Sequence, residues 1–372
     1  MRGLAVSEAP ALPVDTYSFA AMGTVGTLQF PGADARGEQI AKIVRGLEAK
    51  WSRFLPDSEI SVLNRHPGAF MAVSPETWDL LVGARYWQRA TGGLFDVAYV
   101  GAGGGETIRP NPELNLGESA GGAVEESSGF YFRRENIDAA VSRGHGLILH
   151  SGMACVGAGR QLDLGGIGKG VAADLALQSC LDFCKAARGE NESGGTSAAA
   201  GAGVVAGEAS KAGASGCDSR FDSESRIMVN LGSSSLAFRA DENEPWRIGI
   251  RSPWVGTPSP VGYLELCNGS VSLSGTAQEL EPGLDWVTHL VNPLTGQPAQ
   301  SNVALAVVVA KDGITAEAVS TAVLLLGAQA GLDLCVAHHV AAAVFTCDRQ
   351  VLGTPDMVKF LRLGKPGLSA SR

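Results

Sequence analysis

The chain of 372 residues lacks the features that define several large classes of protein. It has no run of about 18 or more apolar residues, so no membrane-spanning helix is predicted. Positive charge is also scarce: the formal net charge is −9 and the pI is about 5.2, which argues against a nucleic-acid binder. The first residues contain no continuous apolar stretch of the kind found in signal peptides or beside lipid anchors, and we therefore expect a cytoplasmic protein.

The seven cysteines are scattered, and none belongs to a Cys-x-x-Cys pair. This spacing argues against a zinc ribbon, and the odd count does not suggest a disulfide framework. Cys180 and Cys184 are one helical turn apart, which we interpret as two small apolar residues on one helix face. The usage of cysteine favours a reducing compartment.

Common nucleotide and hydrolase motifs are missing as well. The chain has no Gly-x-x-x-x-Gly-Lys-Ser/Thr loop and no Gly-x-Gly-x-x-Gly after a strand in its first third. Its Gly-x-Ser-x-Gly string at residues 117–121 lies in a segment predicted to be a surface loop and not at a strand-to-helix elbow. These absences argue against the usual nucleoside-triphosphate and dinucleotide loops, and they give no sign of a covalent serine nucleophile.

The most informative stretch that is present runs Asp163-Leu-Gly-Gly-Ile-Gly-Lys169-Gly170 and leads into an apolar helical segment. Glycines let the backbone approach a ligand, and the N–H groups and dipole at a helix start favour an anion. Lys169 adds a mobile positive charge. The stretch suits a phosphate, although a plain glycine turn remains an alternative.

The remaining pattern predicts strands mixed with helices, without regular alternation, and so an α+β fold. The predicted helices are 39–54, 75–90, 169–187 and 315–326. Ile40, Ile43, Val44 and Leu47 should form one apolar face of the first helix, and Ser74 and Pro75 should open the second. The predicted strands are 17–19, 25–30, 227–231, 246–250, 262–267, 271–273, 303–309 and 341–346.

We expect one large domain over residues 16–364. The Gly/Ala/Ser-rich residues 188–226 are predicted to be a disordered insertion, because they carry too few large apolar side chains to offset the entropy of ordering. Residues 101–128 are predicted to form a long surface loop. Residues 1–15 and 365–372 are predicted to be flexible ends.

Two further segments carry residues suited to chemistry. His289 precedes an Asn-Pro turn, and histidine is the side chain whose ordinary pKa suits proton transfer near neutrality, although a lone histidine is more often structural. Glu317 and Thr321 stand four apart on a helix, and such oxygen ligands suit Mg²⁺. That spacing alone is common on helices that bind nothing.

Polar turns that contain aromatic residues accompany these segments. Residues 52–64 and 92–96 adjoin predicted helices and could line a pocket for a ring or simply cap the helices.

Taken together, these segments resemble one family, the FAD:protein FMN transferases or ApbE-type flavin transferases. The matching pieces occur in the family's order: Met22-Gly-Thr24, 52–64, Gly93-Leu-Phe-Asp96, 163–174, Val229-Asn-Leu-Gly232, 246–251, Ser274-Gly275, 289–296 and 316–327. They span about residues 17–330, apart from the insertion.

The resemblance implies an ApbE/T-fold-like domain of mixed and antiparallel sheets with packed helices. It also implies Mg²⁺-dependent transfer of FMN from FAD to a Thr or Ser hydroxyl of a target flavoprotein, with AMP as the leaving group. The residues implied to contact FAD are Met22, Phe54, Leu94, Phe95, Asp96, Asp163, Lys169 and Leu290. The Gly166 carbonyl, Glu317 and Thr321 would hold the metal, assisted by Ser320, and His289 would be the base or orienter of the hydroxyl.

The chain departs from the family pattern at four places. Glu317 replaces the metal-binding aspartate, and Phe54 replaces a tyrosine. Gly232-Ser233-Ser234 stands in place of Gly-Gly-Asp, and Thr276-Ala277 in place of an aromatic residue. Two alternatives therefore stay open: an FAD pyrophosphatase that uses water as the acceptor, and an FAD-binding or storage protein without turnover.

Overall fold

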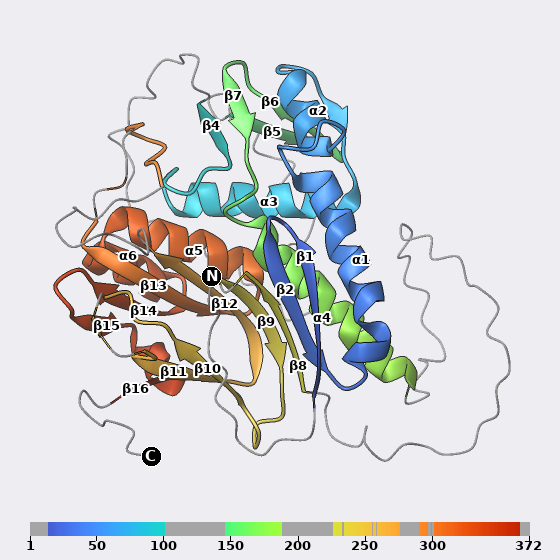
Figure 1. Cartoon of the computed structure of the whole chain (residues 1–372). Helices are drawn as coiled ribbons and strands as arrows, with labels where there is room; N and C mark the ends of the chain where they lie inside the picture. Colours follow the sequence, from blue (N-terminus) through green and yellow to red (C-terminus); the bar gives the residue numbers. More distant parts are fainter. Residues whose placement is uncertain are drawn as a thin grey trace, which may run out of the picture.

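The computed structural model describes residues 14–100, 146–187, 226–232, 234–254, 256–257, 259–275, 290–296, 299 and 301–364. An eight-stranded sheet, antiparallel at every pairing, lies at the centre of the molecule (Figure 1). In sheet order its strands are β1 (Asp15–Ala21), β2 (Thr24–Phe30), β8 (Ile227–Leu231), β9 (Ser235–Arg239), β12 (Asn268–Gly275), β13 (Val303–Ala310), β14 (Ala341–Thr346) and β15 (Val351–Gly353).

Different layers cover the two faces of this sheet. On one face pack α1 (Ala33–Trp51), α4 (Gly168–Ala187) and α5 (Gly313–Leu326), with α6 (Ala328–Ala337) against α5 and β14. On the other face a smaller sheet of β10 (Trp246–Ile250), β11 (Gly262–Leu266) and β16 (Leu361–Leu363), joined by the 3₁₀ turn Pro355–Lys359, encloses a second hydrophobic core.

The sequence of β13, Val-Ala-Leu-Ala-Val-Val-Val-Ala, explains its central place. Side chains of a strand alternate between faces. Ala306 and Val308 therefore enter the core beneath the helices, whereas Leu305 and Val307 enter the core beneath the small sheet. A register shift between Val303 and Leu305 places Val303 in the core beneath the helices as well. A strand that is buried on both sides must be apolar throughout, as this one is.

Above the helix layer lies a group of small elements (Figure 1). It consists of α2 (Glu59–Arg65), α3 (Pro75–Ala90), the pair β4 (Ala98–Val100) and β7 (Arg160–Leu162), and the sheet β3 (Met71–Ala72), β6 (Met153–Val156) and β5 (Leu147–His150). Because α4 begins shortly after β7, this group meets the helix layer at the glycine-rich segment.

The structure confirms the α+β class and most of the predicted elements. The strands around residues 17–30, 227–231, 246–250, 303–309 and 341–346 are present, and α3 and α4 lie as predicted. Among the described residues, no helix is long and apolar enough to span a bilayer.

Several details differ from the sequence prediction. Helix α1 begins at Ala33 and ends at Trp51, because Ser52 already has an extended backbone. Ile43 was predicted to be on its buried face but is 38% exposed. Ser74 is at the N-cap of α3, yet its hydroxyl contacts Thr77 Oγ1 and caps no backbone N–H. The sequence analysis did not identify α2, α6, β9, β15, β16, the pair β4–β7 or the sheet of β3, β6 and β5.

Other predictions fall on residues that the structure does not describe. They are the surface loop 101–128, nearly all of the insertion 188–226, the C-terminal segment 365–372 and most of the N-terminal segment, although Asp15 begins β1. The bounds of the domain therefore stay predictions.

Candidate functional site

The glycine-rich segment forms the bend between β7 and α4. Leu164 and Ile167 are buried and anchor the bend in the core, whereas Gly165 and Gly166 between them are exposed. One carboxylate oxygen of Asp163 accepts a hydrogen bond of 2.9 Å from the Gly165 N–H. The alternation of apolar and glycine residues therefore presents bare backbone to solvent where α4 begins.

Lys169 and Gly170, in the first turn of α4, lie against α5. A Cβ on Gly170 would be 2.7 Å from the Gly313 carbonyl oxygen and 2.8 Å from Cγ of Glu317, so only glycine allows this approach. The two residue types that the sequence analysis assigned separately, the phosphate-binding lysine and the metal-binding carboxylate, thus lie in one place.

The carboxylate of Glu317 is buried, with the residue only 5% exposed. Burial raises its pKa; the charge of Lys169, a hydrogen bond from Ser235 and the backbone of Gly170 act in the opposite direction. Ser235 Oγ on β9 donates to Glu317 Oε1. A buried carboxyl group and the positively charged Lys169 therefore lie beside each other here.

Thr321 and Ser320 follow on α5. Thr321 is half-buried one turn beyond Glu317. Ser320 is fully buried, and its hydroxyl lies 2.9 Å from Ser272 Oγ, 2.8 Å from Ser274 Oγ and 3.0 Å from the Glu317 carbonyl oxygen, to which it donates. Its hydrogen bonds to the two serines join α5 to β12.

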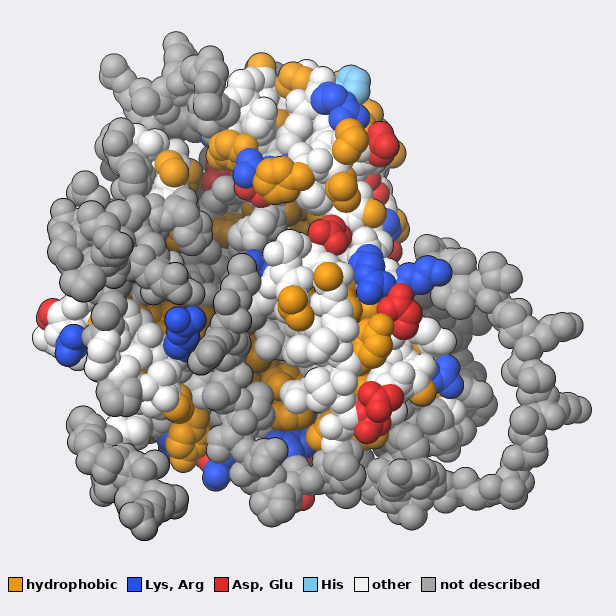
Figure 2. Space-filling model, viewed as in Figure 1, with side chains coloured by type: hydrophobic (Ala, Val, Ile, Leu, Met, Phe, Trp, Pro, Cys, Tyr) orange, Lys and Arg blue, Asp and Glu red, His pale blue; other side chains and the backbone are white. Residues whose placement is uncertain are grey.

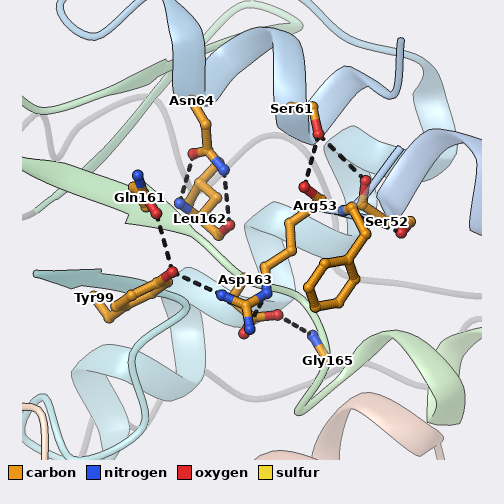
Figure 3. Close-up of polar contacts among 10 residues, drawn as sticks. Ser52, Arg53, Ser61, Asn64, Tyr99, Gln161, Leu162, Asp163 and Gly165 are labelled. Atoms are coloured by element: carbon orange, nitrogen blue, oxygen red, sulfur yellow. Dashed lines mark hydrogen bonds and ion pairs between the residues drawn. The ribbon is translucent and has the colours of Figure 1, made fainter. Parts of the chain in front are cut away.

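On the other side of the bend, Arg53 connects three segments (Figure 3). Its Nε lies 3.3 Å from a carboxylate oxygen of Asp163, and another of its nitrogens donates to the Tyr99 hydroxyl at 2.8 Å. Its guanidinium lies over the ring of Phe54, 4.7 Å from the centroid. Phe54 itself is 80% exposed, so its outer face is open to a ligand.

Hydrogen bonds from α2 hold this arrangement in place (Figure 3). The Asn64 amide donates to the Leu162 carbonyl at 3.0 Å and accepts from the Leu162 N–H at 2.7 Å, as a neighbouring strand would. The Ser61 hydroxyl donates to the Arg53 carbonyl at 3.1 Å. The predicted segment 52–64, which includes most of α2, is therefore hydrogen-bonded to the strand that leads into the bend.

The turn 92–96 adjoins the same bend, since the Asp163 N–H donates to the Val97 carbonyl at 2.9 Å. Leu94 is half-buried, whereas Phe95 lies in the core at 4% exposure. Burial raises the pKa of Asp96, although its carboxylate accepts from the Ala98 N–H at 2.9 Å. Of the predicted FAD contacts in this turn, Phe95 offers the least exposed surface.

Met22 lies in the tight turn between β1 and β2. It is half-buried, packs against the main core, and has a positive φ of 52°, which few residues other than glycine adopt. The turn lies beside the one between β8 and β9, because a Cβ on Gly232 would be 2.5 Å from Thr24 Oγ1. Met22 is thereby linked to the strand that carries Ser235.

Leu290 is half-buried and packs against the main core. A Cβ on Gly93 would be 3.3 Å from Cδ2 of Leu294, so the segment 290–296 meets the turn 92–96. His289 lies outside the described residues. Figure 2, viewed from the same side as Figure 1, shows hydrophobic, basic and acidic side chains close together in the upper half of the molecule, at the level of β7 and α3 in Figure 1.

The donor groups fit Mg²⁺ by their chemistry. Glu317, Thr321 and the Gly166 carbonyl offer only oxygen atoms, which this hard cation prefers. In the part of the chain that the structure describes, no three His, Cys, Asp or Glu side chains gather to form a metal cage. Mg²⁺ commonly takes one or two carboxylates and completes its shell with water and substrate phosphate, so a single buried carboxylate is compatible with it.

Sequence reasoning gave no role to Ser235, Arg53 or Asp174. Asp174 is buried; it accepts from Ser270 Oγ at 2.5 Å and from the Gly313 N–H at 2.6 Å, which fixes the start of α5. The only sequence signal for Arg53 and Asp174 was that they lie in the segments 52–64 and 163–174, which the sequence analysis had selected for other residues. Ser235 gave none, because its partner Glu317 lies 82 positions away.

Comparison with known proteins agrees with this architecture. The model of the ApbE family matches residues 22–203 and 221–345, and the chain therefore belongs to the ApbE family. A FAD:protein FMN transferase of Buchnera aphidicola is 28% identical over 137 residues, and one of Salmonella typhimurium is 27% identical over 123 residues. These matches cover 36% and 32% of this chain and only 40% and 34% of the relatives.

Solved structures share the fold over nearly the whole chain. The ApbE protein of Thermotoga maritima gives a TM-score of 0.65 at 21% identity, covering 94% of this chain and 100% of that one. The flavin transferase ApbE of Vibrio cholerae gives 0.63 at 20% identity, with coverages of 94% and 100%. At these identities the likeness establishes the fold.

Proposed function

We propose that the chain is an FAD:protein FMN transferase, which moves FMN from FAD to a Thr or Ser hydroxyl of a target flavoprotein and releases AMP. Membership of the ApbE family supports this function, as do the curated relatives of that name. The observation that carries it is the contact between the start of α4 and Glu317, which joins an exposed glycine bend, a lysine and a buried carboxylate.

In this proposal the glycine-rich bend between β7 and α4 binds the diphosphate of FAD. The N–H groups at the start of α4 and the ammonium group of Lys169 face negative charge that increases on the non-bridging oxygens during transfer. Glu317, Thr321 and the Gly166 carbonyl hold Mg²⁺, which supplies further neutralisation of phosphate charge. Phe54 offers its open face to one of the rings of FAD, with Leu94, Phe95, Asp96, Asp163, Met22 and Leu290 around it.

The chemical step needs no covalent intermediate on this chain. The acceptor hydroxyl oxygen forms a bond to the FMN-side phosphorus, and the P–O bond to AMP breaks. With His289 as the base, the hydroxyl proton passes to its imidazole; in the alternative role, His289 orients the hydroxyl for attack. AMP leaves with the electron pair of the broken bond.

The decisive experiment is intact-mass analysis of a candidate flavoprotein acceptor after incubation with this protein, FAD and Mg²⁺. The expected result is a gain of one FMN, together with an equal amount of AMP. If AMP appears while the acceptor keeps its mass, the protein is an FAD pyrophosphatase. If FAD binds tightly and no AMP appears, it is an FAD-binding protein without turnover.

A further inference from the structure

The acid at one position where the chain differs from the ApbE pattern is paired with a hydroxyl that directly follows a second such position. Glu317 stands where the pattern has an aspartate, and the turn from Gly232 to Ser234 differs from Gly-Gly-Asp. Strand β9 begins directly after that turn with Ser235, whose hydroxyl donates to Oε1 of Glu317. The longer acid is thus paired with a hydroxyl that directly follows the altered segment.

Ser235 and Gly170 both lie close to the Glu317 side chain. Glu317 and Ser235 are 5% and 1% exposed, so water does not replace their hydrogen bond readily. Gly170 also approaches the side chain, because a Cβ there would lie only 2.8 Å from Cγ of Glu317. A glutamate has one more rotatable bond than an aspartate, and these two contacts restrict that added freedom.

The elements that carry the pair are themselves fixed. Ser235 pairs with Leu231 of β8 and with Ser272 of β12, so hydrogen-bonded strands flank it on both sides. Ser320, one turn from Glu317 on α5, lies within hydrogen-bonding distance of the Ser272 hydroxyl. The position of the Ser235 hydroxyl relative to α5 is therefore set by the sheet.

From this geometry we propose that Ser235 is a positioning residue, which fixes the Glu317 carboxylate so that the longer side chain can serve as the Mg²⁺ ligand. This inference rests on the proposed function. Groups that orient a metal ligand by hydrogen bonding typically change metal affinity about 10- to 100-fold when they are removed.

The test measures Mn²⁺ binding by electron paramagnetic resonance with FAD present at saturation. Four proteins are compared: the native chain, Ser235→Ala, Glu317→Asp and the double variant. We expect Ser235→Ala to weaken Mn²⁺ binding about tenfold or more in the native background. In the Glu317→Asp background we expect less than about a twofold further change, because the shorter side chain no longer reaches the hydroxyl.

Two further variants control for a purely structural effect. Thr354→Val removes another buried hydroxyl, which accepts from the Ala342 N–H at 3.0 Å, and it should leave Mn²⁺ binding unchanged. Ser235→Cys keeps nearly the same size with a weaker donor, so its affinity should lie between those of the native and alanine proteins. This variant also carries the test if the alanine protein does not fold.

The outcomes separate the two proposals. Unchanged Mn²⁺ affinity in Ser235→Ala, or equal losses in the Glu and Asp backgrounds, would overturn the positioning role and leave the transferase standing. A native protein that binds FAD but no Mn²⁺ would overturn the metal site of the proposed function, and the role of Ser235 with it.

Discussion

Phe54 places a large aromatic ring at the edge of the candidate site, where it is 80% exposed and rests on the guanidinium of Arg53. An exposed ring contributes little to folding, but a flat ligand that covers it gains both apolar burial and stacking. The residue therefore fits binding better than stability.

Replacing Phe54 with alanine should weaken FAD binding by about 1–3 kcal/mol, the usual range for loss of a stacking partner. The melting temperature should hardly change. Titration of FAD fluorescence gives the affinity, and the matched control is Phe70→Ala, another exposed phenylalanine at 47% exposure, which lies against His150. Equal affinity of the Phe54 variant and the native protein would rule out stacking at this position.

Lys169 is the half-buried cation at the start of α4, beside Glu317. Lys169→Ala should weaken FAD binding by about 1.5–3 kcal/mol, because a charge-assisted contact to the diphosphate is lost. Equilibrium dialysis of FAD measures the change. Lys185→Ala, at the exposed end of the same helix, should bind FAD normally. Matching affinities for the two variants would contradict the phosphate-binding role of the bend.

Asp96 gives a pH-dependent prediction. Its pKa is raised, chiefly by burial, which outweighs the hydrogen bond from the Ala98 N–H. A carboxyl with a raised folded pKa stabilises the protein at acid pH, and this contribution is lost as the pH rises through the folded pKa. Asp96→Asn should therefore melt higher than the native protein at pH 7. The gain should vanish below about pH 4, where the native carboxyl is protonated as well. A constant difference across this range would show that ionisation is not the cause.

At the scale of elements, the contact between α4 and α5 is made by backbone atoms of two glycines. A Cβ on Gly313 would lie 2.3 Å from the carbonyl carbon of Gly170, a distance that no rotamer can relieve. The two helix starts can approach this closely only because both residues lack a side chain.

Gly313→Ala should therefore destabilise the protein by about 1–3 kcal/mol, the usual effect of overpacking, and should weaken FAD binding by moving α4 from α5. Gly46→Ala in α1 is the matched control, because its new Cβ would meet nothing within 4 Å. That variant should be neutral or up to about 1 kcal/mol more stable, since alanine favours helix. Chemical denaturation measures both, and an unaffected Gly313 variant would contradict the tight contact.

How far the sequence predicted each element depended on how local its signal was. The apolar run of β13 and the Ser-Pro start of α3 lie within the elements themselves, and both were predicted correctly. Ile43 fitted the period of α1 but lies at the margin of its buried face. Strand β9 begins with a serine whose partner is on a distant helix, so it gave no local pattern. The Glu317 and Lys169 motifs could be found separately, but their contact depends on tertiary packing.

At the scale of the molecule, the eight-stranded sheet supplies one wall to each of two cores. Trp51 and Trp87 belong to the core beneath the helices, and Trp246 belongs to the core beneath the small sheet. Because adjacent residues of β13 serve both cores, neither should persist without the other. We expect a single cooperative unfolding transition.

The measurement compares denaturant unfolding of variants that retain only Trp246 or only Trp51 as a fluorescent probe, together with far-ultraviolet circular dichroism. The midpoints should coincide within experimental error, as they do for one cooperative unit. An earlier transition at Trp246 would instead show that the small sheet detaches as a separate unit.

The meeting of Gly170 and Gly313 also bears on how such a protein could be redesigned. Because main-chain atoms of Gly170 and Gly313 are already in close contact there, exchanging nearby side chains cannot bring the two helices closer together. A variant designed for a donor whose phosphate linkage is longer or shorter than a diphosphate would need new loops leading into α4 and α5. A preference for a different ring, in contrast, can be changed by single substitutions around Phe54.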